Sequence, residues 1–178
     1  MNPTTPMAEP SVTSPVTPPV ATPVLNSPVT VDRRTVVVTE RIEIERPADE
    51  VWAAIADYSF DLVWRDGIIQ MTPFPAGTPQ DGTRIHEVLR SSGMTFNTDS
   101  VVSDVAPGVS YRFAGGGTIG QVRGMRSVEP TGDGSAAFTY QVELRPTRHY
   151  RPLRSLLGRT LGSTLHRDLQ RLKQLMEA

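Results

Sequence analysis

The chain has 178 residues, a formal net charge of −1 and no cysteine. The balanced charge gives no global field that would favour nucleic acid or an acidic substrate, and the lack of cysteine excludes disulfides, thiolate metal sites and cysteine nucleophiles. No window reaches the roughly 18–20 apolar residues that a membrane span needs. The N-terminus has no basic segment followed by an apolar one, so the sequence predicts a cytoplasmic protein without a secretory signal.

Residues 1–34 are predicted to form a disordered tail rich in Pro, Thr and Val. Eight of the first 28 residues are proline, which cannot continue a helix and gives no backbone donor to a sheet. The apolar content is too low to offset the entropy that ordering would remove. A solubilising polyproline-II extension is the first interpretation, and a docking segment for a proline-recognition domain is the alternative. Residues 35–178 have the length of one domain.

The domain is predicted to open with a strand that leads into a helix. In Thr35–Glu45 isoleucines alternate with charged residues, as in a half-buried strand. A helix is predicted over Ala48–Asp57, because Pro47 suits the first turn and the two acids that follow suit the positive end of the helix dipole. A shorter helical turn is predicted over Phe60–Arg65.

Six further strands and one long helix follow, separated by turn signals. The predicted strands are Gly67–Pro73, Thr83–Arg90, Met94–Val105, Val109–Ala114, Ile119–Glu129 and Ser135–Arg145. Consecutive antiparallel strands with short turns form a meander. From Leu153 to Met176 leucines recur at steps of three and four residues, which predicts an amphipathic helix about 36 Å long. A helix of that length can cover one side of such a sheet.

The segment Glu40–Trp64 and three later stretches resemble the START-like, or SRPBCC, superfamily, and within it the polyketide cyclase/dehydrase-like branch. The later stretches are Asp81–Ile85, Val105–Gly108 and Val128–Tyr140, and they occur in the order of the family. The resemblance covers about residues 35–178. It implies an α+β helix-grip fold, in which a curved antiparallel sheet of about seven strands surrounds a long C-terminal helix. Two short helices follow strand one, and the internal cavity of such proteins binds hydrophobic small molecules.

Alternation of side chains along each strand indicates which residues face that cavity. The residues predicted to contact a ligand are Trp64, Glu87, Phe96, Tyr111, Phe113, Arg126, Phe138, Tyr140, Leu157 and Leu161. Trp64 is equally consistent with the packed core, because aromatic side chains serve both purposes.

Two charged residues fall on the inward faces of their strands. Glu87 needs a partner or water there. A turn at residues 131–134 that pairs Val128 with Ala136 would point Arg126 inward as well. The hypothesis is that Glu87 and Arg126 contact each other and orient a ligand carbonyl or hydroxyl. The alternatives are a purely structural pair, or a one-residue slip that turns both side chains to solvent.

Binding of a lipid or polyketide-like molecule is the first predicted function. The alternative is a polyketide cyclase or aromatase acting in the same cavity, with Glu87 or His86 as the candidate base. A third hypothesis is a protein-interaction module. No catalytic residue is assigned, no cofactor motif is present, and the three histidines lack metal-ligand spacing. The oligomeric state is left open.

The C-terminal region is basic. Between residues 145 and 176 eight Arg and Lys side chains accompany one acid, Asp168. One interpretation is a solvated helix face covered by long cationic side chains. The other is attraction to anionic lipid or to an acidic partner, so the sequence leaves peripheral membrane contact open.

Overall fold

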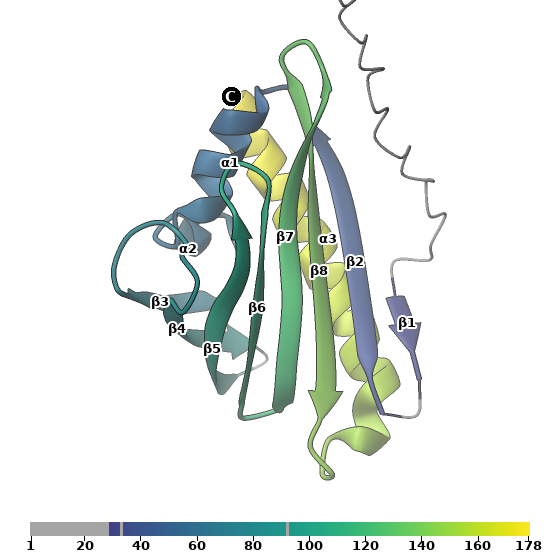
Figure 1. Cartoon of the computed structure of the whole chain (residues 1–178). Coiled ribbons are helices and arrows are strands. Elements are labelled where there is room, and N and C mark those ends of the chain that lie inside the picture. Colours follow the sequence, from purple (N-terminus) through teal and green to yellow (C-terminus); the bar gives the residue numbers. More distant parts are fainter. Residues whose placement is uncertain (1–28, 33, 92) are drawn as a thin grey trace, which may run out of the picture.

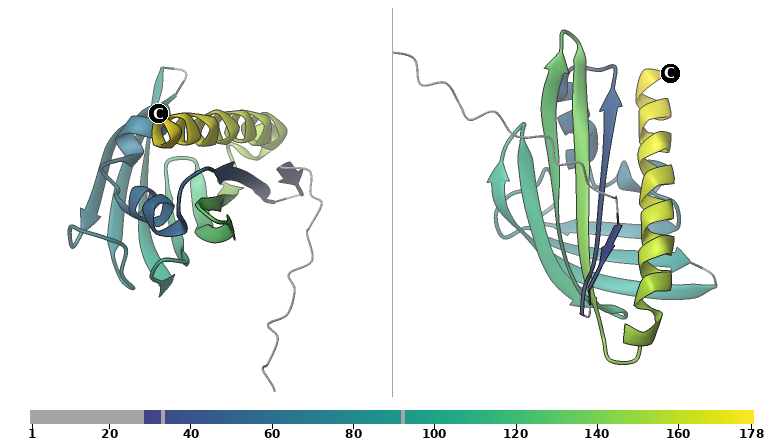
Figure 2. Two further views of the ribbon diagram at one scale, coloured as in Figure 1. Left: turned by 90° about the horizontal axis from the view of Figure 1, so that it is seen from above. Right: turned by 90° about the vertical axis from the view of Figure 1, so that its right-hand side faces the viewer.

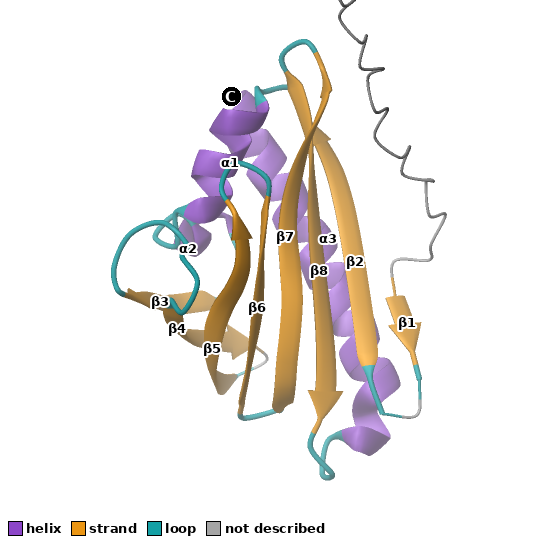
Figure 3. Ribbon diagram, in the orientation of Figure 1, coloured by secondary structure: helices purple, strands orange, loops and turns teal. Residues whose placement is uncertain are grey.

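An eight-stranded antiparallel sheet bends around one long helix (Figures 1 and 3). The computed structural model describes residues 29–32, 34–91 and 93–178, so most of the predicted tail lies outside the described residues. The strands are β1 Val29–Val31, β2 Val36–Ile44, β3 Ile68–Phe74, β4 Arg84–Ser91, β5 Met94–Ala106, β6 Ser110–Gly117, β7 Gly120–Gly132 and β8 Ser135–Pro146. Their order is β1-β2-β8-β7-β6-β5-β4-β3.

Three helices and one 3-10 turn accompany the sheet. They are α1 Ala48–Ala56, α2 Asp61–Trp64, the 3-10 turn Arg151–Leu153 and α3 Arg154–Glu177. Seen from above, the sheet curves, and the helices lie on its concave side (Figure 2). This is the predicted α+β helix-grip arrangement, with one strand more than expected. None of the helices in the described ranges is both long and apolar enough to cross a membrane.

The additional strand, β1, lies within the stretch that was assigned to the tail. It pairs antiparallel with β2, with Val29 opposite Val38. Two helix glycines permit its close approach to α3, since a Cβ added at Gly162 would lie 2.7 Å from a methyl carbon of Val29. At Gly158 an added Cβ would meet Val31 and Val36 at 3.1 and 3.2 Å. These glycines therefore serve the packing of strands β1 and β2 against the helix.

The β7–β8 register differs by two residues from the predicted one. Val128 lies opposite Phe138 and Arg126 opposite Tyr140, with a register shift between Pro130 and Gly132. Because side chains alternate with a period of two, a two-residue offset keeps every side chain on its face. Arg126 accordingly still points inward, as predicted.

The main core lies between α1, α3 and the strands β2 and β8. Its buried residues are Val36, Val38, Ile42, Ile44, Val51, Ile55, Trp64, Val128, Ala136, Phe138, Tyr140, Val142, Leu165, Leu169 and Leu172. Burial is complete for Trp64 and Phe138, whose ring centroids lie 6.2 Å apart in an edge-to-face arrangement. This core holds α3 against the β2–β8 part of the sheet.

Candidate functional site

A cavity of about 180 Å³ lies between α3 and the strands β3 to β8. Seven of the ten side chains predicted to contact a ligand line it, and these are Glu87, Phe96, Tyr111, Phe113, Arg126, Tyr140 and Leu161. They come from five strands and from α3, so the cavity is formed by the larger part of the curved sheet.

The other three predicted residues do not line the cavity. Trp64 and Phe138 are fully buried in the core, and Leu157 lies on α3 outside the cavity wall. Strand alternation and helical spacing indicate the face of a side chain but not its depth. The sequence therefore could not separate the packed part of the interior from the hollow part.

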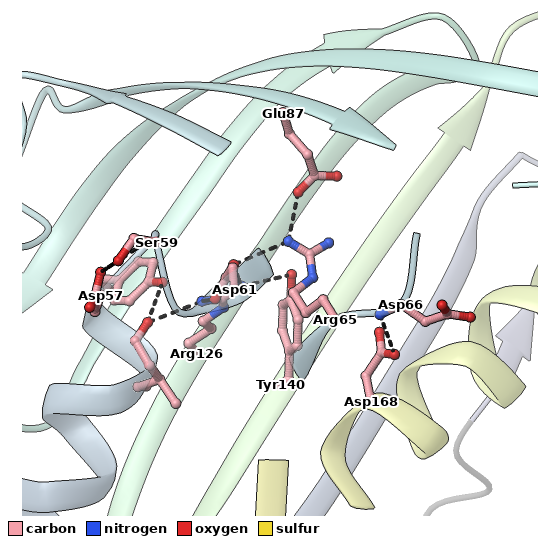
Figure 4. A network of polar contacts seen from close by, with 11 residues as sticks. Asp57, Ser59, Asp61, Arg65, Asp66, Glu87, Arg126, Tyr140 and Asp168 are labelled. Atoms are coloured by element: carbon pink, nitrogen blue, oxygen red, sulfur yellow. Dashed lines mark hydrogen bonds and ion pairs between the residues drawn. The ribbon is translucent and has the colours of Figure 1, made fainter. Parts of the chain in front are cut away.

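A buried ion pair joins Arg126, which lines the cavity, to Asp61 behind it (Figure 4). Arg126 is 2 % exposed and Asp61 0 %. The guanidinium binds the carboxylate in two places, with Nη1–Oδ1 at 3.0 Å and Nη2–Oδ2 at 2.6 Å. Arg126 Nη1 also donates to the Ile55 carbonyl at 3.0 Å, and the Tyr140 ring centroid lies 4.6 Å from Arg126 Cζ. A carboxylate, a carbonyl and an aromatic face thus compensate the buried cation.

Glu87 contacts Arg65 and not Arg126, which corrects the predicted pairing. Arg65 Nη1 donates to Glu87 Oε2 at 2.7 Å and to Asp61 Oδ2 at 3.2 Å. The two residues of the hypothesis are therefore joined through Arg65 and Asp61 (Figure 4). Both of these intermediates were missed, because Asp61 begins a four-residue helix without a periodic pattern and Arg65 directly follows that helix. Their spacing of four residues on a predicted helical turn was the available signal.

Both arginines remain cationic. Burial by itself would lower the pKa of Arg65, but Glu87, Tyr140 and Asp61 together raise the pKa above its ordinary value. Burial acts in the same direction on Arg126, where the attraction of Asp61 leads the opposing contributions and the pKa is again raised. Arg65 uses only Nη1 for its two bonds, and no described residue pairs with its Nε or Nη2. This edge of the guanidinium is available to a ligand.

Two further polar groups border the cavity. Asp168 projects from α3, is 5 % exposed and accepts the Asp66 backbone N–H at 2.9 Å. Burial raises the pKa of Asp168 to about 6, so it titrates close to neutral pH. The Tyr58 hydroxyl is buried and has no partner among the described residues. Burial raises the pKa of Tyr58 to about 12, so this hydroxyl stays neutral.

Both groups were missed by the sequence analysis. Asp168 was counted only as the lone acid of the basic helix. Its spacing of seven and three residues from Leu161 and Leu165 places it on their side of the helix and was the signal available. No cluster of three His, Asp or Glu side chains that would suit a metal ion is found within residues 29–32, 34–91 and 93–178.

Comparison with known proteins agrees with this architecture. The sequence model of the family "Polyketide cyclase / dehydrase and lipid transport" matches residues 35–177. No match is found among curated proteins.

Several solved structures share the fold at low sequence identity. A START superfamily protein from Mycobacterium smegmatis is 15% identical, with a TM-score of 0.66, over 79% of this chain and 97% of that one. The aromatase/cyclase Zhui from Streptomyces sp. R1128 is 12% identical, with a TM-score of 0.62, over 79% and 90%. The di-domain ARO/CYC StfQ of the steffimycin pathway is 12% identical, with a TM-score of 0.67. That match covers 82% of this chain and 51% of StfQ.

Proposed function

Because the chain belongs to the polyketide cyclase/dehydrase and lipid transport family, we propose that its cavity binds a small hydrophobic molecule that carries a carbonyl or hydroxyl group. The observation that carries this proposal is the cavity itself, in which apolar walls converge on a few buried polar groups.

The size of the cavity restricts the ligand. A cavity of about 150 Å³ accepts benzene, and pockets for drug-sized ligands measure about 300–1,000 Å³. The 180 Å³ found here therefore suits a compound of one or two rings. A long acyl chain or a folded poly-β-keto chain exceeds this volume.

Apolar and polar contacts would have separate roles. Burial of the rings against side chains such as Met71, Ile85 and Phe113 supplies affinity at about 25 cal/mol per Å² before the costs of association. The unpaired edge of Arg65 supplies donors for a ligand oxygen. A ligand that presents one acceptor to these donors binds in one orientation.

Native mass spectrometry of the purified full-length protein, followed by organic extraction, is the direct test. The expected result is an added mass that extraction releases as a compound of one or two rings. A co-purifying long-chain lipid would contradict the size argument, because such a chain exceeds the cavity.

A cavity-filling variant gives a matched binding test. We expect Leu161→Trp to weaken binding of 2-naphthol about tenfold or more, because the indole occupies space that the ligand needs. Leu175→Trp is the control, since Leu175 lies on the same helix, 42 % exposed and outside the cavity wall. Fluorescence titration measures both variants, and thermal unfolding verifies that each is folded. Unchanged affinity for 2-naphthol in a folded Leu161→Trp variant would contradict binding in the cavity.

A second candidate function is an enzyme of the cyclase or aromatase type in the same cavity. Asp168 favours it, because a buried carboxyl with a pKa of about 6 is suited to proton transfer near neutral pH. In this candidate Arg65 polarises a ligand carbonyl and Asp168 exchanges a proton with the adjacent carbon. Turnover by the wild type that Asp168→Asn abolishes, while 2-naphthol binding persists, would separate the enzyme from a carrier.

A further inference from the structure

The outward surface of α3 carries basic side chains and no acid. Residues three, four and seven apart share one side of a helix. The exposed residues on the side away from the sheet are Leu156, Arg159, Thr160, Ser163, Arg167, Gln170, Arg171 and Gln174. The two acids of the helix are engaged elsewhere, since Asp168 lines the cavity and Glu177 pairs with Lys173 at 3.0 Å. We call this surface, together with residues 148–153 that precede the helix, the basic face.

The positive charge of the basic face is not neutralised within the described part of the chain. Arg148, Arg151, Arg159 and Arg171 form no ion pair with any described carboxylate, whereas arginines of the outer sheet surface, such as Arg41 and Arg123, do. The whole chain has a net charge of −1 although residues 145–176 carry eight basic side chains and one acid. The rest of the molecule is therefore acidic, and the charge separation would orient the basic face toward an anionic surface.

Two large apolar side chains project between these arginines. Leu153 is 49 % exposed and Leu156 is 60 % exposed, and both follow Arg151 within two turns. An amphipathic segment that presents exposed leucines among cations is typical of helices lying in the headgroup region of a membrane. An acidic protein partner would account for the arginines but gives no specific reason for the leucines.

The cavity adjoins the same stretch of α3. Leu161 and Thr164, one to two turns after Leu156, line the cavity wall. In Figure 2 α3 forms one side of the molecule, and none of the described elements covers its outer surface. A membrane at the basic face would therefore lie beside the cavity that holds the apolar ligand.

We propose that the basic face docks on an anionic lipid surface, with Leu153 and Leu156 inserted at headgroup level and the arginines beside the lipid phosphates. This inference concerns the outer surface of α3 and is independent of what the cavity binds. Cations near an anionic membrane each contribute about a fivefold gain in partitioning. Salt weakens that contribution by screening.

Sedimentation with sucrose-loaded vesicles tests the proposal on the full-length protein. The probes are vesicles of phosphatidylcholine alone and of a two-to-one mixture of phosphatidylcholine and phosphatidylglycerol. We expect binding to the mixed vesicles only, decreasing as salt is added. The double variant Arg151→Gln/Arg159→Gln should bind about 25-fold more weakly, and Leu156→Ser should bind more weakly with an unchanged dependence on salt.

The matched control is Arg112→Gln/Arg123→Gln, which removes the same charge from exposed positions on the outer surface of β6 and β7. Retained binding by this control supports the proposal. An equal loss in both double variants would show that net charge alone is responsible and would overturn it. Absence of binding to the mixed vesicles, or salt-sensitive binding to polyglutamate in its place, would also overturn it. Measuring 2-naphthol affinity in the same variants keeps a failure here distinct from a failure of the cavity.

Discussion

Asp61→Ala is expected to lower the free energy of unfolding by about 3–5 kcal/mol, because it leaves the Arg126 guanidinium buried without its counter-charge. Arg126 is only 2 % exposed, and Asp61 holds both of its terminal nitrogens. The remaining Ile55 carbonyl and the Tyr140 ring do not carry a full negative charge. Urea denaturation followed by tryptophan fluorescence measures the loss as a lower midpoint at constant m-value.

The control for this prediction is Glu129→Ala. Glu129 pairs with Arg41 at 3.0 Å, but both side chains are more than half exposed. Exposed pairs of this kind contribute about 0–1 kcal/mol, so the midpoint should hardly move. Equal losses in Asp61→Ala and Glu129→Ala would contradict the buried ion pair.

A double replacement separates the ion pair from simple packing. In Asp61→Leu/Arg126→Met no charge is left unpaired, and apolar side chains fill the same space. We expect it to recover most of the stability that Asp61→Ala loses, since buried ion pairs can often be replaced by apolar residues at little cost. If the double variant is as unstable as Asp61→Ala, the loss arises from shape and not from charge.

Asp168→Asn is expected to stabilise the protein at pH 8 by about 2–3 kcal/mol and to leave its stability nearly unchanged at pH 4. The pKa of Asp168 is about 6 in the folded protein and 3.8 in the ordinary aspartate. Between these values the unfolded chain has released the proton that the folded chain still holds. The stability of the wild type therefore falls as pH rises from about 4 to about 6, and it stays lower above that window. Asparagine removes this dependence and keeps an oxygen for the Asp66 N–H.

The measurement is the free energy of unfolding of both proteins from pH 4 to pH 8. Asp133→Asn in the exposed β7–β8 turn controls for the loss of one carboxylate. A difference between wild type and Asp168→Asn that does not change with pH would contradict a raised pKa at this position.

The fold was predictable because its signals are local and repeated. Alternation located seven of the eight described strands, and leucine spacing located α3 within one residue at each end. The β7–β8 register was wrong by two residues because a bulge in a hairpin leaves no clear mark on the alternation. Arg126 was still placed on the inward face, because an offset of two residues keeps each side chain on the same face of its strand.

The candidate site was less predictable because its polar contacts join distant parts of the chain. Glu87 was placed on the correct face, but its partner Arg65 directly follows α2, 22 residues earlier. Arg126 and Asp61 are separated by 65 residues. Pattern analysis gives the direction of a side chain and carries no information about which helix residue lies opposite it. The sequence pattern could not place Trp64 either. Its burial in the core depends on how α2 packs against the rest of the molecule and not on the spacing of apolar residues.

The short strand β1 also has a consequence for self-association. It pairs with the first three of the nine residues of β2, Val36–Val38, which would otherwise form the edge of the sheet there. At the opposite edge β3 contains Pro73 and a register shift between Ile68 and Gln70, so it offers an interrupted row of donors. Each border of the sheet is thus interrupted over part of its length, which limits the addition of a strand from another molecule. Loss of the three residues of β1 would leave all nine residues of β2 as one regular edge to which another molecule could add a strand.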